Sequence, residues 1–128
     1  MTTIGVKSGR EQYVLTDQNK TVNLRYFVVI CDHPPNLCPH SNLIARKRFL
    51  ERGNGLNEMA KTVGIEIIFA GIPVPEHKIF MVLRAPNFET VRRLMVESGI
   101  VQMNTVKIYT TESFEEFAEE VKKSTPIF

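Results

Sequence analysis

The chain has 128 residues, of which 43% are hydrophobic and 23% are charged, and this composition fits one ordinary globular domain. Its formal net charge is only +2, so the strongly basic surface typical of proteins that bind nucleic acid or membranes is not expected. Two cysteines are too few for a disulfide framework. Without a secretory leader pattern or an apolar run long enough to cross a bilayer, the sequence predicts a cytoplasmic protein with reduced thiols.

The first 22 residues lack a sustained hydrophobic period, and we expect an N-terminal extension over 1–22 that is flexible at least to Gly9. Within it, Tyr13-Val14-Leu15 is suited to a short edge strand. Residues 23–128 are predicted to form a single α+β domain.

The first core strand is predicted over 24–33, LRYFVVICDH, because aromatic and β-branched residues dominate this run and Pro34 and Pro35 stop it. Ser41 then suits the cap of a helix that reaches Val63. Gly53 and Gly55 interrupt the apolar stripe of this helix, so a bend or a close contact is expected there.

The remaining elements follow from the same signals. Strands are predicted over 65–71, 78–85 and 101–110, and a second helix between the last two is capped by Asn87 and ended by Gly99. A final amphipathic helix starts near Thr111 or Ser113 and is expected to bury four residues: Phe114, Phe117, Ala118 and Val121.

This order of elements is β-α-β-β-α-β plus a C-terminal helix, the ferredoxin-like arrangement. Right-handed crossovers place the strands in the antiparallel order 4-1-3-2, with both helices on one face of the sheet. The other face is left bare and apolar, so we expect a homodimer or higher homo-oligomer that packs sheet against sheet. The tail residues Pro126, Ile127 and Phe128 are candidates to join this contact.

Two stretches are EHKIFMVLRAPNFETV, around the third core strand, and VKIYT, in the final strand. With them, the region from roughly Leu24 to Thr111 is similar to the dimeric α+β barrel superfamily. The segment His33-Pro-Pro-Asn-Leu-Cys38-Pro39 further resembles small members of this superfamily that have His-x4-Cys-Pro after strand one. The resemblance implies two ferredoxin-like subunits packed sheet to sheet. It implies no single activity, because the superfamily includes quinol monooxygenases, haem-degrading and chlorite-decomposing enzymes, muconolactone isomerases and ligand sensors.

Candidate metal ligands gather at one rim of the predicted sheet. His33 ends the first strand, Cys38 lies in the following loop, and His77 begins the third strand, which runs antiparallel beside the first. Imidazole and thiolate are ligands that zinc, copper and iron favour. The sequence therefore predicts one transition-metal ion per subunit, with zinc or copper best suited and iron also suitable.

Several other residues are candidates for supporting roles at this rim. His40 is a further candidate ligand, although Pro39 can turn it outward, and Asp32 or Glu76 can supply a carboxylate in or around the coordination sphere. Cys31 is more typical of a small buried hydrophobe.

Two alternatives use the same region without a metal. Cys38 precedes the predicted helix and can act as a reactive thiol, either a nucleophile or a persulfide carrier, with His33 or His77 as base. The other alternative is an oligomer that binds a small ligand or has a structural role. No nucleotide cofactor is expected, because the only Gly-x-Gly run lacks a preceding strand and a following lysine. Four basic residues on the first helix could attract an anion, but a solvated face is the preferred interpretation: Arg46, Lys47, Arg48 and Arg52.

Overall fold

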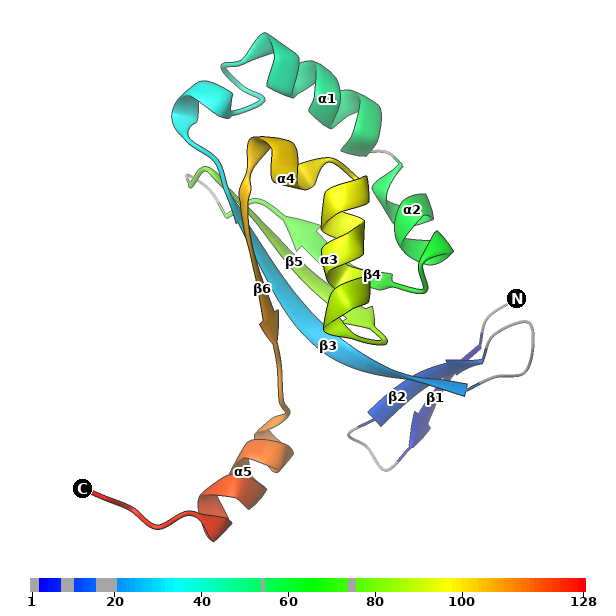
Figure 1. The fold of residues 1–128 in the computed structure, drawn as a ribbon, viewed down its shortest axis with the longest axis vertical. Coiled ribbons are helices and arrows are strands. Elements are labelled where there is room, and N and C mark those ends of the chain that lie inside the picture. Colours follow the sequence, from blue (N-terminus) through cyan, green and yellow to red (C-terminus); the bar gives the residue numbers. More distant parts are fainter. Residues whose placement is uncertain (1–2, 8–10, 16–20, 54, 74–75) are drawn as a thin grey trace.

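The computed structural model describes residues 3–7, 11–15, 21–53, 55–73 and 76–128 (Figure 1). The strands are β1 (Thr3–Lys7), β2 (Glu11–Leu15), β3 (Thr21–Asp32), β4 (Glu66–Gly71), β5 (Lys78–Ala85) and β6 (Thr105–Thr110). The α-helices are α1 (Leu43–Gly53), α2 (Leu56–Thr62), α3 (Phe88–Glu97), α4 (Ile100–Met103) and α5 (Phe114–Lys123), and a short 3₁₀ helix, η1, spans Pro35–Leu37.

The central sheet confirms the predicted strand order. Strands β6, β3, β5 and β4 lie side by side in that order and every neighbouring pair is antiparallel, which is the predicted order 4-1-3-2. Strand β3 is an interior strand of this sheet, because it pairs with β5 on one side and with β6 on the other. The structure is therefore an α+β fold with a four-stranded antiparallel sheet at its centre.

The amino-terminal residues add two strands to β3. Residues Tyr13, Val14 and Leu15 belong to β2, which pairs antiparallel with the first residues of β3, while β1 pairs with the other side of β2. The predicted short strand is therefore present, but it lies between two strands instead of at an edge. Gly9 is outside the described residues, and the division into 1–22 and 23–128 remains a prediction.

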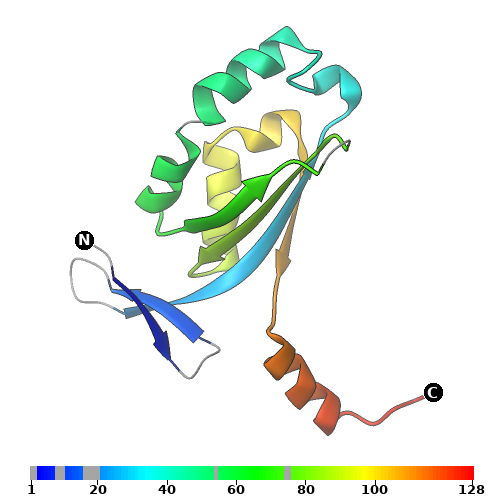
Figure 2. The same cartoon turned by 180° about the vertical axis from the view of Figure 1, so that it is seen from behind.

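The core lies between the sheet and the helices on one of its faces, as predicted. The helix-facing side chains of β3 alternate with residues of the other face, as the period of a strand requires. Their partners come from β5, from Ala60 on α2 and from α3, and the cluster includes Val29, Cys31, Met81, Leu83, Val91 and Leu94. Figures 1 and 2 show α1 to α4 on this one side of the sheet and no helix against the other.

The predicted helix over 41–63 is in fact two helices. Helix α1 ends at Gly53 and α2 begins at Leu56, so the glycine pair separates two elements instead of bending one. The cap is also one residue later than predicted: the Oδ1 atom of Asn42 accepts from the backbone N–H of Ala45 at 2.9 Å. Gly64 then follows with a left-handed φ of 79°, as a helix end commonly requires.

The predicted strand over 101–110 is too long at its start. Gly99 ends α3 with a left-handed φ of 81°, but the chain then forms the single turn α4 before β6 begins at Thr105. Val101 and Met103 therefore belong to a helical turn instead of a strand. This correction matters for the site, because it places Asn104 at a junction between two elements.

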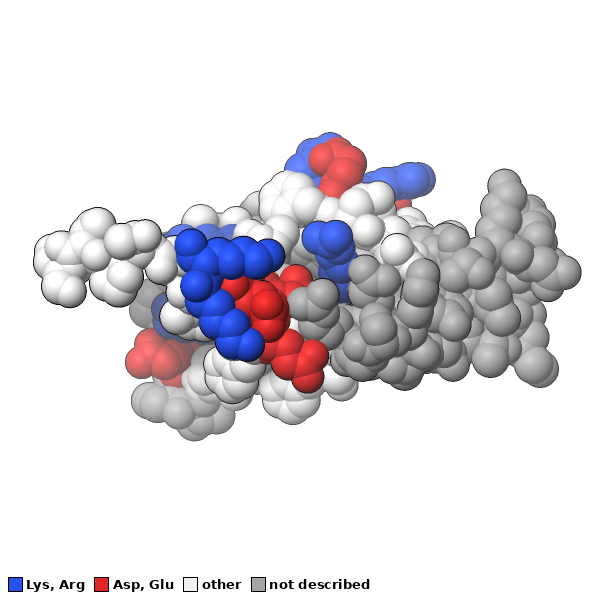
Figure 3. All heavy atoms as spheres, turned by 90° about the horizontal axis from the view of Figure 1, so that it is seen from below, with Lys and Arg blue, Asp and Glu red and all other residues white. Residues whose placement is uncertain are grey.

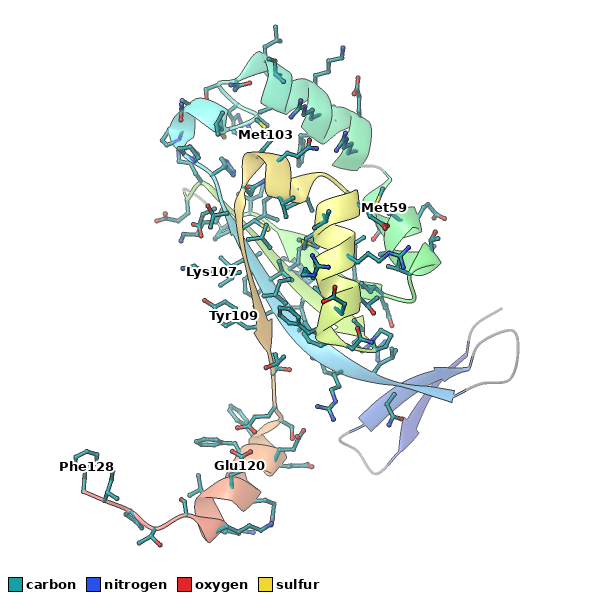
Figure 4. The ribbon with its side chains drawn as sticks, viewed as in Figure 1. Met59, Met103, Lys107, Tyr109, Glu120 and Phe128 are labelled. Carbon is teal, nitrogen blue, oxygen red and sulfur yellow. The ribbon has the colours of Figure 1, made fainter. Side chains whose placement is uncertain are left out.

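Helix α5 begins as predicted but does not pack as predicted. Ser113 and Glu116 form the reciprocal capping box. Phe114 is nevertheless 93% exposed, and Phe117, Ala118 and Val121 are exposed as well. Helix α5 extends away from the sheet (Figure 1), and Figure 4 shows Phe128 at the end of the tail that follows this helix, also away from the sheet. The amphipathic pattern predicted the helix correctly, but its apolar side has no cover within the described chain.

The surface charge and the character of the helices also bear on the function. Seen from below, Lys and Arg side chains lie beside Asp and Glu side chains, so the charges of the described residues on this side are of mixed sign (Figure 3). Among the described residues, no helix has the length and apolar character needed to cross a membrane.

Candidate metal centre

The strand register brings two histidines together. Cys31 pairs with Ile79 and Asp32 with Lys78, so the next pair along the same ladder is His33 and His77. The backbone N–H of His33 donates to the carbonyl of His77 at 3.1 Å. The two rings meet edge to face with their centroids 5.7 Å apart. The antiparallel pairing of neighbouring strands thus closes a separation of more than forty residues, as predicted.

The loop after β3 brings a thiol to the same place. One donor atom from each of His33, Cys38 and His77 lies within 4.8 Å of the other two. Cys38 is buried at 5% exposure, whereas His77 is exposed. The predicted convergence of these three residues at the rim of the sheet is therefore confirmed, and it forms a group with one face toward solvent.

The loop that carries Cys38 is fixed by hydrogen bonds to the start of α1. The carbonyl of Cys38 accepts from the backbone N–H groups of Ser41 and Asn42, at 3.0 and 2.8 Å. The guanidinium of Arg46 reaches back to the carbonyls of Pro39 and His40, at 3.0 and 2.7 Å. Arg46 belongs to the helix face that was predicted to be solvated, and the structure shows that it also holds this loop.

Asn104 orients the His33 ring. Its Oδ1 atom lies 2.9 Å from Nδ1 of His33, and its Nδ2 group donates to the carbonyl of Ile100 at 3.0 Å. Because the amide nitrogen is thus engaged, the amide oxygen is the acceptor and Nδ1 of His33 carries the proton. The lone pair of the neutral ring is then on Nε2, as in histidines that bind metals through Nε2.

The Nε2 atom of His33 is buried and has no hydrogen-bond partner in the described part of the chain. A buried polar atom without a partner carries a free-energy cost. A metal ion bound at Nε2 would remove this cost. The sequence pattern did not identify Asn104, because the predicted strand ran through it; an Asn within an apolar strand was a signal for a break.

The remaining candidates lie outside the three-residue group. His40 is exposed. Asp32 faces the bare side of the sheet, where its carboxylate pairs with Lys78 at 2.9 Å, and this hydrogen bond holds the pKa of Asp32 below its usual value. Glu76 is exposed beside His77 and is not a member of the group either.

Cys31 has a different environment from Cys38. Its side chain is fully buried in the core. Burial, with a smaller effect of the Asp32 charge, raises the pKa of the Cys31 thiol to about 12. The thiol therefore stays protonated at neutral pH, in agreement with the predicted structural role.

Comparison with known proteins gives a structural similarity but no matching family. No family model matches the chain, and no curated protein is significantly similar to it in sequence. Among solved structures, it is similar to the solution structure of the C-terminal domain of the MgtC protein from Mycobacterium tuberculosis, with 14% identity and a TM-score of 0.43 over 84% of this chain and 95% of that chain.

Proposed function

We propose that this protein binds one transition-metal ion per subunit through His33, Cys38 and His77. The observation that carries the proposal is the convergence of the three residues, since one donor atom of each lies within 4.8 Å of the other two. The buried Nε2 atom of His33, which has no hydrogen-bond partner among the described residues, supports it. One thiolate with two imidazoles suits zinc or copper best, and iron is also compatible.

Small side-chain movements would complete the site. With metal–nitrogen and metal–sulfur bonds of about 2.0–2.3 Å, tetrahedral ligands lie about 3.3–3.8 Å apart, which is shorter than the upper limit of 4.8 Å for this group. His77 is exposed and has room to rotate, whereas Asn104 holds His33 and the loop holds Cys38. Three protein ligands leave one position for solvent or a substrate, as in reactive metal sites.

Metal content is the test. Protein without a polyhistidine tag is expected to carry close to one metal ion per chain after reconstitution with zinc, copper or iron. Cys38→Ala and His77→Ala should lose it, and His40→Ala is the matched control, because His40 lies nearby but outside the group. Wild-type protein with far less than one ion per chain, or unchanged metal content in both ligand variants, would refute the proposal.

The same three residues also suit a thiol enzyme in which His33 or His77 serves as the base for Cys38. This alternative predicts rapid alkylation of Cys38 whether or not a chelator is present, whereas a metal ligand is protected when the metal is bound. The burial of Cys38 favours the ligand role. A cytoplasmic location, where thiols remain reduced, belongs to both alternatives.

We further propose that the subunit is a ferredoxin-like member of the dimeric α+β barrel superfamily and pairs with a second copy through its sheet. The face without helices supports this proposal, because it presents an apolar stripe bounded by the Asp32–Lys78 and Glu66–Arg84 ion pairs: Tyr26, Val28, Ile30, Phe69, Phe80, Val82 and Tyr109. Figure 4 shows Lys107 and Tyr109 pointing from β6 away from the helices. Sedimentation at micromolar concentration should give a dimer or larger oligomer; a species of 14.6 kDa would contradict it.

A further inference from the structure

A second feature beside the candidate centre is a cavity between α1 and the helix-facing side of the sheet. Its volume is about 370 Å³, which lies within the range of small-molecule sites. Ile79 and Met81 of β5 form part of one wall, and Phe49 and Leu50 of α1 form part of the opposite one. His33 and Asn104 also line the cavity, so it adjoins the candidate metal centre.

The cavity exists because α1 packs on the body through a small side chain. Ala45 is the buried residue of α1 among those described. Phe49 and Leu50 face the cavity yet remain 46% and 61% exposed. Apolar surface of Phe49 and Leu50, and part of that of the half-buried Ile79 on the opposite wall, is thus left without protein atoms to cover it. An apolar molecule that filled this space would remove that surface from water.

The charged groups at the cavity have one sign. Arg48 and Arg52 line it, and no Asp or Glu occurs among the described lining residues. Nη1 of Arg52 donates to the carbonyl of Ser98 at 3.3 Å, and Nη1 of Arg48 lies 3.5 Å from Oε1 of Gln102. A guanidinium has five N–H donors, so each arginine keeps donors for a ligand. These two arginines belong to the helix face that was predicted to be solvated, and the structure places them at a cavity.

We propose that this cavity binds a small apolar molecule that carries a carboxylate group. The apolar body would lie against Ile79, Phe49 and Leu50, and the carboxylate would bind the guanidinium groups of Arg48 and Arg52, whose planar forks match its two oxygens. The inference goes beyond metal binding and does not require it, because both arginines and the apolar walls are present without an ion. His33 connects the two sites.

A matched series of probes tests the chemistry. Calorimetry on reduced, chelator-treated protein would compare 2-naphthoate with 2-naphthylmethanol and 2-naphthylmethylamine, which share an apolar body and differ in charge. The carboxylate is expected to bind at least tenfold more tightly than the alcohol, and the amine most weakly. Equal affinity for the three probes, or no saturable binding of naphthoate, would overturn the proposal.

Variants locate the binding. Arg48→Gln and Arg52→Gln should each reduce the preference for naphthoate over the alcohol at least fivefold, whereas Lys47→Gln removes the same charge from α1 outside the cavity lining and should change nothing. Ala45→Phe should fill the cavity and weaken all binding at least tenfold, with Ala45→Leu as a milder version if the larger side chain impairs folding. Naphthoate affinity that is unchanged in the arginine and Ala45 variants would place the binding elsewhere and overturn the proposal.

The same titration on Cys38→Ala separates this inference from the metal proposal. Naphthoate binding should survive in this variant even though its metal binding is lost. Loss of naphthoate binding in Cys38→Ala with the fold intact, as judged by circular dichroism, would contradict a ligand site built from α1 and the sheet.

Discussion

The surroundings of the two cysteines differ in a way that burial alone does not reveal. Cys31 and Cys38 are exposed by 0% and 5%, so both are buried. Cys31 lies among apolar side chains on β3, and its thiol stays protonated because burial raises its pKa to about 12. Cys38 lies in a loop fixed by polar contacts, beside two imidazoles. The neighbouring donors, and not the burial of the sulfur, distinguish a candidate ligand from a core residue.

The largest expected difference between the two thiols is in alkylation. A pKa of about 12 instead of 9.0 leaves Cys31 about a thousandth of the thiolate of an ordinary cysteine. Iodoacetamide at pH 8 should therefore label Cys38 of the metal-free protein while Cys31 stays unmodified, and bound metal should protect Cys38. Mass spectrometry of the digested protein would measure both rates. Comparable labelling of the two cysteines, or no protection of Cys38 by metal, would contradict the different roles given to them.

The next effect concerns the residue that orients His33. Asn104→Leu removes the acceptor for the Nδ1 proton, and loss of such a partner typically lowers metal affinity about 10–100-fold. Asn104→Asp keeps an acceptor and should retain most of the affinity. Competition with a chromogenic chelator would measure both variants. Equal affinity of Asn104→Leu and the wild type would show that the hydrogen bond does not serve the metal.

The pH dependence of stability tests the Cys31 side of the comparison. Above pH 9.0 the thiol ionises in the unfolded chain, while in the fold it keeps its proton until about pH 12. The free energy of unfolding should therefore fall by up to about 1.4 kcal/mol per pH unit in this window and gain nothing from this group below it. Urea unfolding at pH 8 and 10 should show this loss in the wild type and a smaller one in Cys31→Ala. An equal fall in the free energy of unfolding in the wild type and in Cys31→Ala would contradict the raised pKa of the Cys31 thiol.

The smallest effect concerns the loop that carries Cys38. Asn42→Ala removes the cap of α1 and should lower the free energy of unfolding by about 1 kcal/mol. Ser41→Ala, at the position predicted from the sequence, should cost less than about 0.5 kcal/mol, because Ser41 is exposed and its hydroxyl serves only the loop carbonyls of Pro35 and Cys38. Thermal unfolding would compare the stabilities of the two variants. If Ser41→Ala lost more stability than Asn42→Ala, Ser41 and not Asn42 would be the cap of α1.

The strand register explains why the principal site residues were predictable. Runs rich in aromatic and β-branched residues, each stopped by proline, defined β3 and β5, and antiparallel pairing then placed His33 beside His77. Asn104 was missed for the opposite reason: the apolar residues before it continued the β pattern, whereas Gly99 starts the extra turn α4. A hydrophobic pattern measures period and not where a chain turns.

Helix α5 shows a second limit of the sequence. Its capping box and period are local features and were predicted, because each depends on residues within one or two turns. What its apolar side contacts depends on residues remote in sequence or on another chain, and the described residues provide no cover for Phe114. The cavity was hidden for a related reason, since a void results from how α1 rests on the sheet.

A cobalt(II) titration of reduced protein without a tag tests the metal centre most directly, because cobalt reports sulfur ligation in its absorption spectrum. We expect saturation at one ion per chain, with a sulfur-to-cobalt charge-transfer band that is absent from Cys38→Ala and retained in Cys31→Ala. A titration without saturation, or a band that survives in Cys38→Ala and disappears in Cys31→Ala, would contradict it.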